Sequence, residues 1–383
     1  MQRTWTTVLL VALSVAAWGC ETDDPEETPT PDMGVGAEGE GEGEGEGEGE
    51  GEGEGEGEGE GEGEGEGEGE GECTAHPDDY PGANWPACIS DSGDYEPVLP
   101  DSISTIARIA SFETIADLLW RADAPPSADD FIDGRIEYAI DQGLDSRVQR
   151  RYDPHYTAPE DGSSCRDEGV PDQYPDYCVG PAQILPVIVQ AFQAGSAGED
   201  PWINAARVEA GLLWFLYAST YKEAYSCQST AKDCDSSWAY YGGGAQDGEM
   251  ATGFGGYVQA LEPDTHDRVF DAHLAVRCWR DIDDGETAMD EALHQQALRQ
   301  LDAAVDRGLA VILIDRIETW AAAEGDARAA AWAFLQVLGP VIDRAARDVD
   351  AAAADRVLDA WDDGATADAD ALVADLEMLF PCN

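Results

Sequence analysis

Apolar residues recur every three or four positions through most of the chain after residue 100. In the segment 102–120, isoleucine, phenylalanine and leucine follow this spacing, which is the period of one helix face. The pattern continues in the segments 127–151, 181–194, 203–226, 264–281, 291–324, 326–342, 350–362 and 368–380. No run after residue 100 alternates with the two-residue period of a strand. The sequence therefore predicts an all-α fold, built as one helical bundle or as two packed bundles.

The segment 203–226 is the most apolar of these helices. Leu212, Leu216 and Tyr217 share one face, and Trp214 and Phe215 widen it, so the helix is expected to be buried on more than one side. Its polar residues must then be paired or serve a site. For Glu223 two interpretations stand: an ion pair with an arginine, or a carboxylate that binds a metal.

Local sequence features predict where some helices begin or bend. Ser127 followed by Asp130 is an approximate capping box. Asp235 precedes a serine pair and an aromatic run, which resembles a helix N-cap. Gly339-Pro340 predicts a kink in the helix that contains it.

The N-terminal 72 residues predict export and a tether. Residues 1–19 have the basic start, apolar stretch and small residues of a signal peptide, and Cys20 stands where a bacterial lipoprotein carries its lipid. Residues 20–72 end in a pure Glu-Gly alternation, which has no apolar residue to form a core. We expect a disordered tether there, an irregular clasp at 73–100 rich in cysteine and proline, and a helical body at 101–383. This organisation predicts an envelope protein held by a lipid on the outer membrane or cell surface, with the periplasm as the alternative.

Eight cysteines remain when Cys20 is set aside, and an even number in an exported chain predicts disulfides. They are Cys73, Cys88, Cys165, Cys178, Cys227, Cys234, Cys278 and Cys382. The favoured pairs are the local ones, Cys73–Cys88, Cys165–Cys178 and Cys227–Cys234, which leave Cys278–Cys382. No CxxC occurs, so a zinc or redox motif is not expected.

Charge narrows the possible partners. The chain has 81 acidic and 21 basic residues and a formal net charge of −60, which disfavours nucleic acid and favours cations or a basic protein partner. Adaptation to a saline habitat would also explain such a surface. One basic patch interrupts it, formed by Arg147, Arg150, Arg151 and His155. These residues either pair with nearby carboxylates or form an anion site.

Candidate metal ligands are few, and no catalytic motif occurs. The chain lacks HExxH, GxSxG and a phosphate-binding loop, so we expect no enzyme, although paired carboxylates need no motif. Oxygen donors with occasional histidine suit iron. The candidates are Glu209, Glu223, Asp235, His266 and His273, the two histidines being seven residues apart on one helix face.

Two segments resemble a known family. The stretch at 325–362, which begins GDARAAAWAFLQVLGPVID, and the run DSSWAYYG at 235–242 resemble the secreted algal iron-assimilating proteins. The resemblance implies a periplasmic or extracellular helical protein linked to iron acquisition. It assigns no ligand residues. The combined expectation is a surface lipoprotein with a helical domain that binds a metal, with iron as the expected ion. The alternative is a tethered, non-enzymatic protein-interaction module.

Overall fold

The computed structural model describes residues 93–99, 104–140, 143–160, 162–282, 291–362 and 367–382. The chain divides into two units, 1–66 and 67–383, and all described residues belong to the second. Within them every regular element is a helix and no strand occurs, which confirms the all-α prediction. No described helix is both long enough and apolar enough to cross a membrane. Cys20 and the predicted tether lie outside the described residues.

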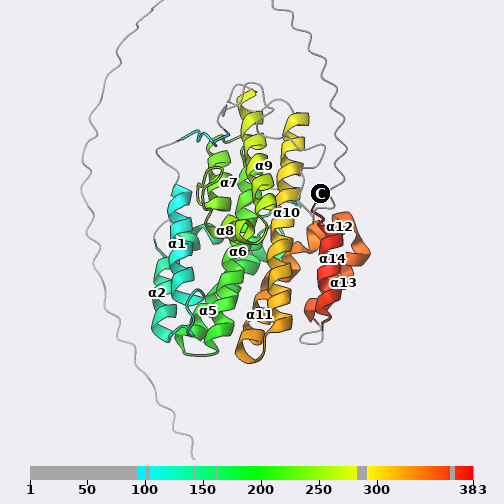
Figure 1. Ribbon diagram of the computed structural model, residues 1–383. Helices are drawn as coiled ribbons and strands as arrows, with labels where there is room; N and C mark the ends of the chain where they lie inside the picture. The colour runs from blue at the N-terminus through cyan, green and yellow to red at the C-terminus, as the bar shows by residue number, and fades with distance from the viewer. Residues whose placement is uncertain are drawn as a thin grey trace, which may run out of the picture. The chain divides into compact units, whose positions relative to one another are not determined.

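Most helices follow one another with short connections, while a longer segment joins α3 to α4 (Figure 1). The first half contains α1 (Ser104–Leu119), α2 (Ala128–Tyr138), α3 (Leu144–Val148), α4 (Val170–Gln173), the π-helix η2 (Gly180–Ile184), α5 (Leu185–Ser196), α6 (Pro201–Ser226) and α7 (Lys232–Gly242). The second half contains α8 (Gly253–Leu261), α9 (Pro263–Ile282), α10 (Glu291–Ala322), α11 (Gly325–Leu338), the 3₁₀-helix η3 (Gly339–Ile342), α12 (Asp343–Val349), α13 (Ala351–Asp362) and α14 (Ala369–Leu379).

Helix α6 is the centre of the bundle. It packs against α5, α7, α8, α10 and α11, so its neighbours surround it on several sides (Figure 1). Its middle turns, including Leu212, Leu213 and Leu216, are completely buried, as the width of the apolar face predicts. One hydrophobic cluster extends from Ile109 on α1 to Phe380 after α14. The described residues therefore form one bundle with one main core, not two.

Several predicted boundaries are confirmed. Ser127 and Asp130 form the capping box at the start of α2, with the Asp130 side chain accepting from the Ser127 amide at 2.7 Å. The bend predicted at Gly339-Pro340 is the 3₁₀-helix η3 between α11 and α12. A proline cannot donate a backbone hydrogen bond, so the regular helix stops there.

Three local predictions were wrong. The single helix expected over 127–151 is divided into α2 and α3, because the chain turns after Ile140 and the Gly143 amide donates to the Ile140 carbonyl at 2.7 Å. Helix α8 begins within the glycine-rich stretch 242–256, for which the sequence pattern predicts a loop. Asp235 does not cap a helix, since α7 already begins at Lys232.

Disulfides staple the bundle as expected. Cys165 pairs with Cys178 beside α4, and Cys227 pairs with Cys234 between α6 and α7. Cys278 and Cys382 are also disulfide-bonded. Their predicted pairing with each other stays a prediction, and Cys73 and Cys88 lie outside the described residues. The described end of the predicted clasp lies on α7, where the rings of Tyr95 and Trp238 stack with centroids 4.5 Å apart.

Candidate functional site: a pocket lined by arginines

The five candidate metal ligands each have separate partners. Glu209 accepts from Tyr257 at 2.8 Å and from Arg316 at 2.9 Å. Glu223 accepts from Arg151 at 2.7 Å and from Lys222 at 2.9 Å. The ion pair between Glu223 and an arginine is therefore confirmed.

The remaining three candidates are likewise held by their own neighbours. Asp235 accepts from the backbone amides of Val98 at 2.9 Å and Leu99 at 3.0 Å. The hydroxyl of Tyr241 lies 3.0 Å from Nδ1 of His266. Burial lowers the pKa of His273 to about 4, so its ring is neutral at pH 7.

These five residues do not converge on one point. In the part of the chain that the structure describes, no group of three or more histidine, cysteine, aspartate or glutamate side chains could hold a metal ion. The metal-site prediction thus gains no support from the arrangement of its own candidates. A buried carboxylate on a helix requires a partner, and the partners of the three candidate carboxylates are arginine, lysine, hydroxyl and amide groups.

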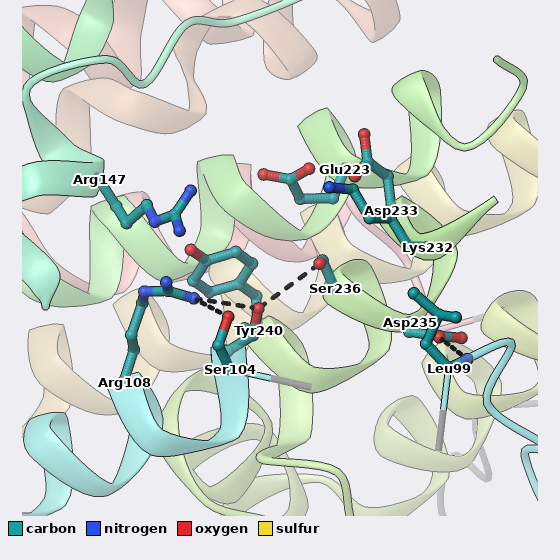
Figure 2. Close-up of a pocket in the computed structure, with 11 residues that line it drawn as sticks. Leu99, Ser104, Arg108, Arg147, Glu223, Lys232, Asp233, Asp235, Ser236 and Tyr240 are labelled. Atoms are coloured by element: carbon teal, nitrogen blue, oxygen red, sulfur yellow. Dashed lines mark hydrogen bonds between the residues drawn. The ribbon is translucent and has the colours of Figure 1, made fainter. Parts of the chain in front are cut away.

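A polar pocket opens where α1, α3, α6 and α7 meet, and we call it the arginine pocket. It encloses about 180 Å³. The lining residues are Leu99, Ser104, Thr105, Arg108, Arg147, Glu223, Lys232, Asp233, Asp235, Ser236 and Tyr240. Figure 2 shows Arg108 and Arg147 on one side, Glu223, Lys232 and Asp233 on the other, and Ser236 and Tyr240 between them. Its volume lies below the roughly 300–1,000 Å³ of pockets for drug-sized ligands, so it suits a small solute.

Arg147 lines this pocket without a carboxylate partner. No described residue forms an ion pair or a hydrogen bond with its side chain, and its Nε is buried and unpartnered. A buried guanidinium donor without an acceptor is unfavourable unless a ligand or water accepts from it. The side chain is therefore suited to hold an oxygen ligand in the pocket.

Arg108 lies beside Arg147 and is itself almost fully buried, with 5% exposure. It donates to Ser104 Oγ at 3.2 Å and to Thr105 Oγ1 at 3.5 Å. Burial lowers the pKa of Arg108, Tyr240 acts in the opposite direction, and the positive charges of Arg147 and Arg151 lower the pKa further. Like charges have therefore been brought together at this wall, and an anion placed between them would reduce their repulsion.

The opposite wall is acidic but crowded with cations. Burial raises the pKa of Asp233, and the neighbouring Glu223 raises it further. Both lysines of the chain lie here: Lys222 pairs with Glu223, and Lys232 lines the pocket. The acidic wall thus contains cations of its own, whereas Arg147 on the opposite wall has no carboxylate partner among the described residues.

Two helix starts also face the pocket. The first turns of α1 and α7 contribute Ser104, Thr105, Lys232, Asp233, Asp235 and Ser236 to its lining. The positive ends of helix dipoles favour anions, and the serine and threonine hydroxyls add donors. Arginines, hydroxyls and helix ends together form a site that can bind a small oxyanion.

The sequence indicated part of this site. The basic patch pointed to Arg147, while Arg151 forms the buried pair with Glu223. His155 belongs to a separate hydrogen-bond network with Asp153 and Asp302. Arg108 and Ser104 carried no signal, because they come from a helix whose apolar period was its only notable feature. Comparisons with protein-family models, with curated proteins and with solved structures find no match to this chain.

Proposed function

We propose that this protein is an envelope lipoprotein whose helical body binds a small oxyanion, such as a carboxylate or a phosphate, in the arginine pocket. The observation that carries the proposal is Arg147, which faces the pocket beside Arg108 with no carboxylate to neutralise it. Guanidinium groups bind carboxylate and phosphate oxygens through paired, charge-assisted hydrogen bonds. The site therefore provides recognition, and no reaction step is assigned to it.

The charge distribution supports an anion over a cation as the ligand. Four arginines and two lysines gather at or beside the pocket: Arg108, Arg147, Arg150, Arg151, Lys222 and Lys232. The lining itself carries three cations, Arg108, Arg147 and Lys232, and three carboxylates, Glu223, Asp233 and Asp235, so the pocket is close to neutral in a protein whose net charge is −60. Burial lowers the pKa of Arg150, and Arg147 and Arg166 lower it further, which is the expected effect of crowded positive charges.

Membrane attachment is the second part of the proposal. The sequence supports it through a signal-peptide pattern at 1–19, a cysteine at the position that bears the lipid in bacterial lipoproteins, Cys20, and the Glu-Gly alternation that follows. Fully stretched, the segment 21–72 would reach about 170 Å at roughly 3.3 Å per residue. A flexible chain of that length has an end-to-end distance near 40 Å, from about 5–6 Å times the square root of its length. Either length would hold the binding domain clear of a membrane surface.

Calorimetric titration of the chain from Cys20 onward tests the binding proposal. The probes are inorganic phosphate and succinate at pH 7 in about 0.15 M salt, where the Debye length is about 8 Å. Arg147→Met should weaken binding by about tenfold or more, the size of one lost charge-assisted hydrogen bond. Arg135→Met is the matched control, because Arg135 is an exposed arginine on α2 away from the pocket.

The outcomes separate the competing functions. No heat with either anion at millimolar concentration, or equal binding by the two arginine variants, would refute the oxyanion proposal. A ferric titration runs in parallel: stoichiometric iron without anion binding would restore the metal function expected from the sequence. Incorporation of labelled palmitate that is lost in Cys20→Ser tests the anchor independently.

An interaction module is the second candidate, and one surface favours it. Ile132, Ile136 and Ile140 are spaced four residues apart along α2 and just beyond its end, and all three are exposed, Ile136 to 63%. Acidic residues flank this stripe, including Asp129, so a basic amphipathic helix would complement it. Fluorescence anisotropy with a lysine- and leucine-rich helical peptide tests the candidate. Unchanged binding in Ile136→Asp would exclude the stripe.

A further inference from the structure

A second polar network lies on the other side of α6. Tyr217, Tyr221 and Tyr225 are spaced four residues apart and so share one face of that helix. Each hydroxyl donates to a different carboxylate. Tyr217 donates to Asp306 at 2.5 Å, Tyr221 to Asp153 at 2.8 Å and Tyr225 to Asp302 at 2.7 Å. The network thus joins α6, α10 and the loop that follows α3.

His155 bridges two of these carboxylates. Its Nδ1 lies 2.8 Å from Asp153 and its Nε2 lies 3.2 Å from Asp302. Burial lowers the pKa of His155, but the two carboxylates outweigh burial and raise it to about 9. The imidazole is therefore protonated at neutral pH and adds a fixed positive charge to this region.

A pocket of about 460 Å³ opens beside the network, between α10, α12 and the end of α14, and we call it the C-terminal pocket. Its wall carries five basic side chains, namely His155, Arg268, Arg299, Arg307 and Arg344, against three carboxylates, Asp302, Asp306 and Asp348. Carboxylates just outside the lining pair with two of these cations, Asp153 with His155 and Glu262 and Glu377 with Arg307.

Two of the arginines keep donors for a ligand. Arg344 approaches Asp306 at 3.5 Å and Asp348 at 3.9 Å, and within the described residues it makes no hydrogen bond. Arg299 is exposed and forms neither an ion pair nor a hydrogen bond with a described residue. Arg307, in contrast, donates to Glu262, to Glu377 and to the Phe380 carbonyl, so its donors are already used.

The rest of the wall is apolar. Val349 at the end of α12, together with Leu379, Phe380 and Pro381 after α14, lines the pocket, and Val349 is 59% exposed. Exposed apolar surface beside unsatisfied cationic donors fits a ligand with an apolar part and an anionic part. The volume lies within the roughly 300–1,000 Å³ typical of small-molecule pockets.

We propose that the C-terminal pocket binds a small monocarboxylate with an apolar tail, such as a short-chain fatty acid or an aryl acid. Its carboxylate accepts hydrogen bonds from Arg344 and Arg299, and its tail packs on Val349 and the segment 379–381. This site is distinct from the arginine pocket, whose lining is almost entirely polar. The proposal stands whether or not the arginine pocket binds an anion.

Calorimetry with hexanoate, 1-hexanol and hexylamine on the chain from Cys20 onward tests the ligand class. Hexanoate is expected to bind, hexanol at least about tenfold more weakly because it lacks the charge, and hexylamine not measurably. Two substitutions address the site at exposed positions that should not disturb folding. Arg299→Met removes a hydrogen-bond donor to the ligand's carboxylate, and Val349→Asp places a negative charge against the ligand's tail. Both should weaken hexanoate binding by about tenfold or more.

Controls make each outcome decisive. Arg135→Met, which lies outside both pockets, should leave hexanoate binding unchanged. Arg344→Lys keeps the charge but loses the paired geometry, so it should weaken hexanoate without changing the circular dichroism spectrum. Three results would each overturn the proposal. They are no hexanoate binding at concentrations up to about 10 mM, which would detect a Kd of about 1 mM, equal affinity for hexanol, and unchanged affinity in both Arg299→Met and Val349→Asp.

Discussion

The buried ion pair between Arg151 and Glu223 allows an asymmetric prediction about stability. Arg151 is 4% exposed and Glu223 is 8% exposed. Arg151 has one ionic partner, and its other close neighbours are the rings of Phe215 and Tyr240, 5.3 and 5.2 Å from the guanidinium carbon. Glu223 has a second cation, Lys222, at 2.9 Å. Removing the Glu223 carboxylate should therefore destabilise the fold more than removing the Arg151 guanidinium.

The magnitudes follow from what each substitution leaves behind. Glu223→Met leaves a buried guanidinium with no counter-charge beside Arg108 and Arg147, which should lower the free energy of unfolding by about 3–5 kcal/mol. Arg151→Met leaves Glu223 paired with Lys222 and removes one repelling charge, so its effect should be about 1.5–3 kcal/mol, the size of one hydrogen bond to a charged group. The double variant should be more stable than Glu223→Met alone, because it contains no orphaned charge.

Urea unfolding followed by far-ultraviolet circular dichroism at pH 7 measures these differences. The comparison requires that the slope of unfolding free energy against urea concentration is the same for all variants. Arg121→Met is the control, because Arg121 is 39% exposed in its ion pair with Glu113 and exposed pairs contribute about 0–1 kcal/mol. If Arg151→Met destabilised the protein as much as Glu223→Met, or if the double variant were the least stable of the three, the reasoning would fail.

Two further predictions concern stability elsewhere in the bundle. Asp153 and Asp302 hold the pKa of His155 near 9 in the folded protein, against an ordinary value of 6.5, so His155 stabilises the protein by about 3 kcal/mol below pH 6.5 and loses this contribution as pH rises through 9. The difference in unfolding free energy between the unmodified protein and His155→Gln should therefore shrink between pH 6 and pH 10 in urea titrations, and a constant difference would contradict the prediction. Gly195→Ala should lower the free energy of unfolding by about 1–3 kcal/mol, because a Cβ at that position would overlap the Phe131 ring; calorimetry should show a lower melting temperature, and an unchanged one would show that the ring can move aside.

The sequence predicted the architecture well because the helices are long and periodic. The segment 203–226 had an apolar face too wide for a surface helix, and α6 is indeed surrounded. Local rules failed where tertiary contacts decide the structure. Helix α8 forms despite its glycines, since Phe254 and Val258 are completely buried in the core. Asp235 had the sequence context of a cap, but it accepts hydrogen bonds from the backbone at Val98 and Leu99, over a hundred residues earlier.

The candidate sites were harder to predict for the same reason. Periodicity identifies which face of a helix is buried, but not which distant helix supplies a partner. Glu223 clearly needed a counter-charge, yet several arginines could have provided it. Likewise, His155 belonged to a recognisable basic patch, but its contact with Asp302 joins residues 147 positions apart. Such pairings depend on how the helices pack together, and the spacing of residues within one helix carries no information about that packing.

Both pockets are local exceptions to a strongly acidic protein, and this contrast bears on how an anion reaches them. With a net charge of −60, the protein as a whole repels anions over long distances. Salt at about 0.15 M screens charges beyond about 8 Å, which removes most of that repulsion, while hydrogen bonds to buried guanidinium groups such as that of Arg108 are screened much less. Moderate salt should therefore accelerate anion entry more than it weakens the bound contacts. An acidic surface and arginine-lined pockets are thus compatible in a saline medium, where the surface keeps the protein soluble and the short-range donors still select the ligand.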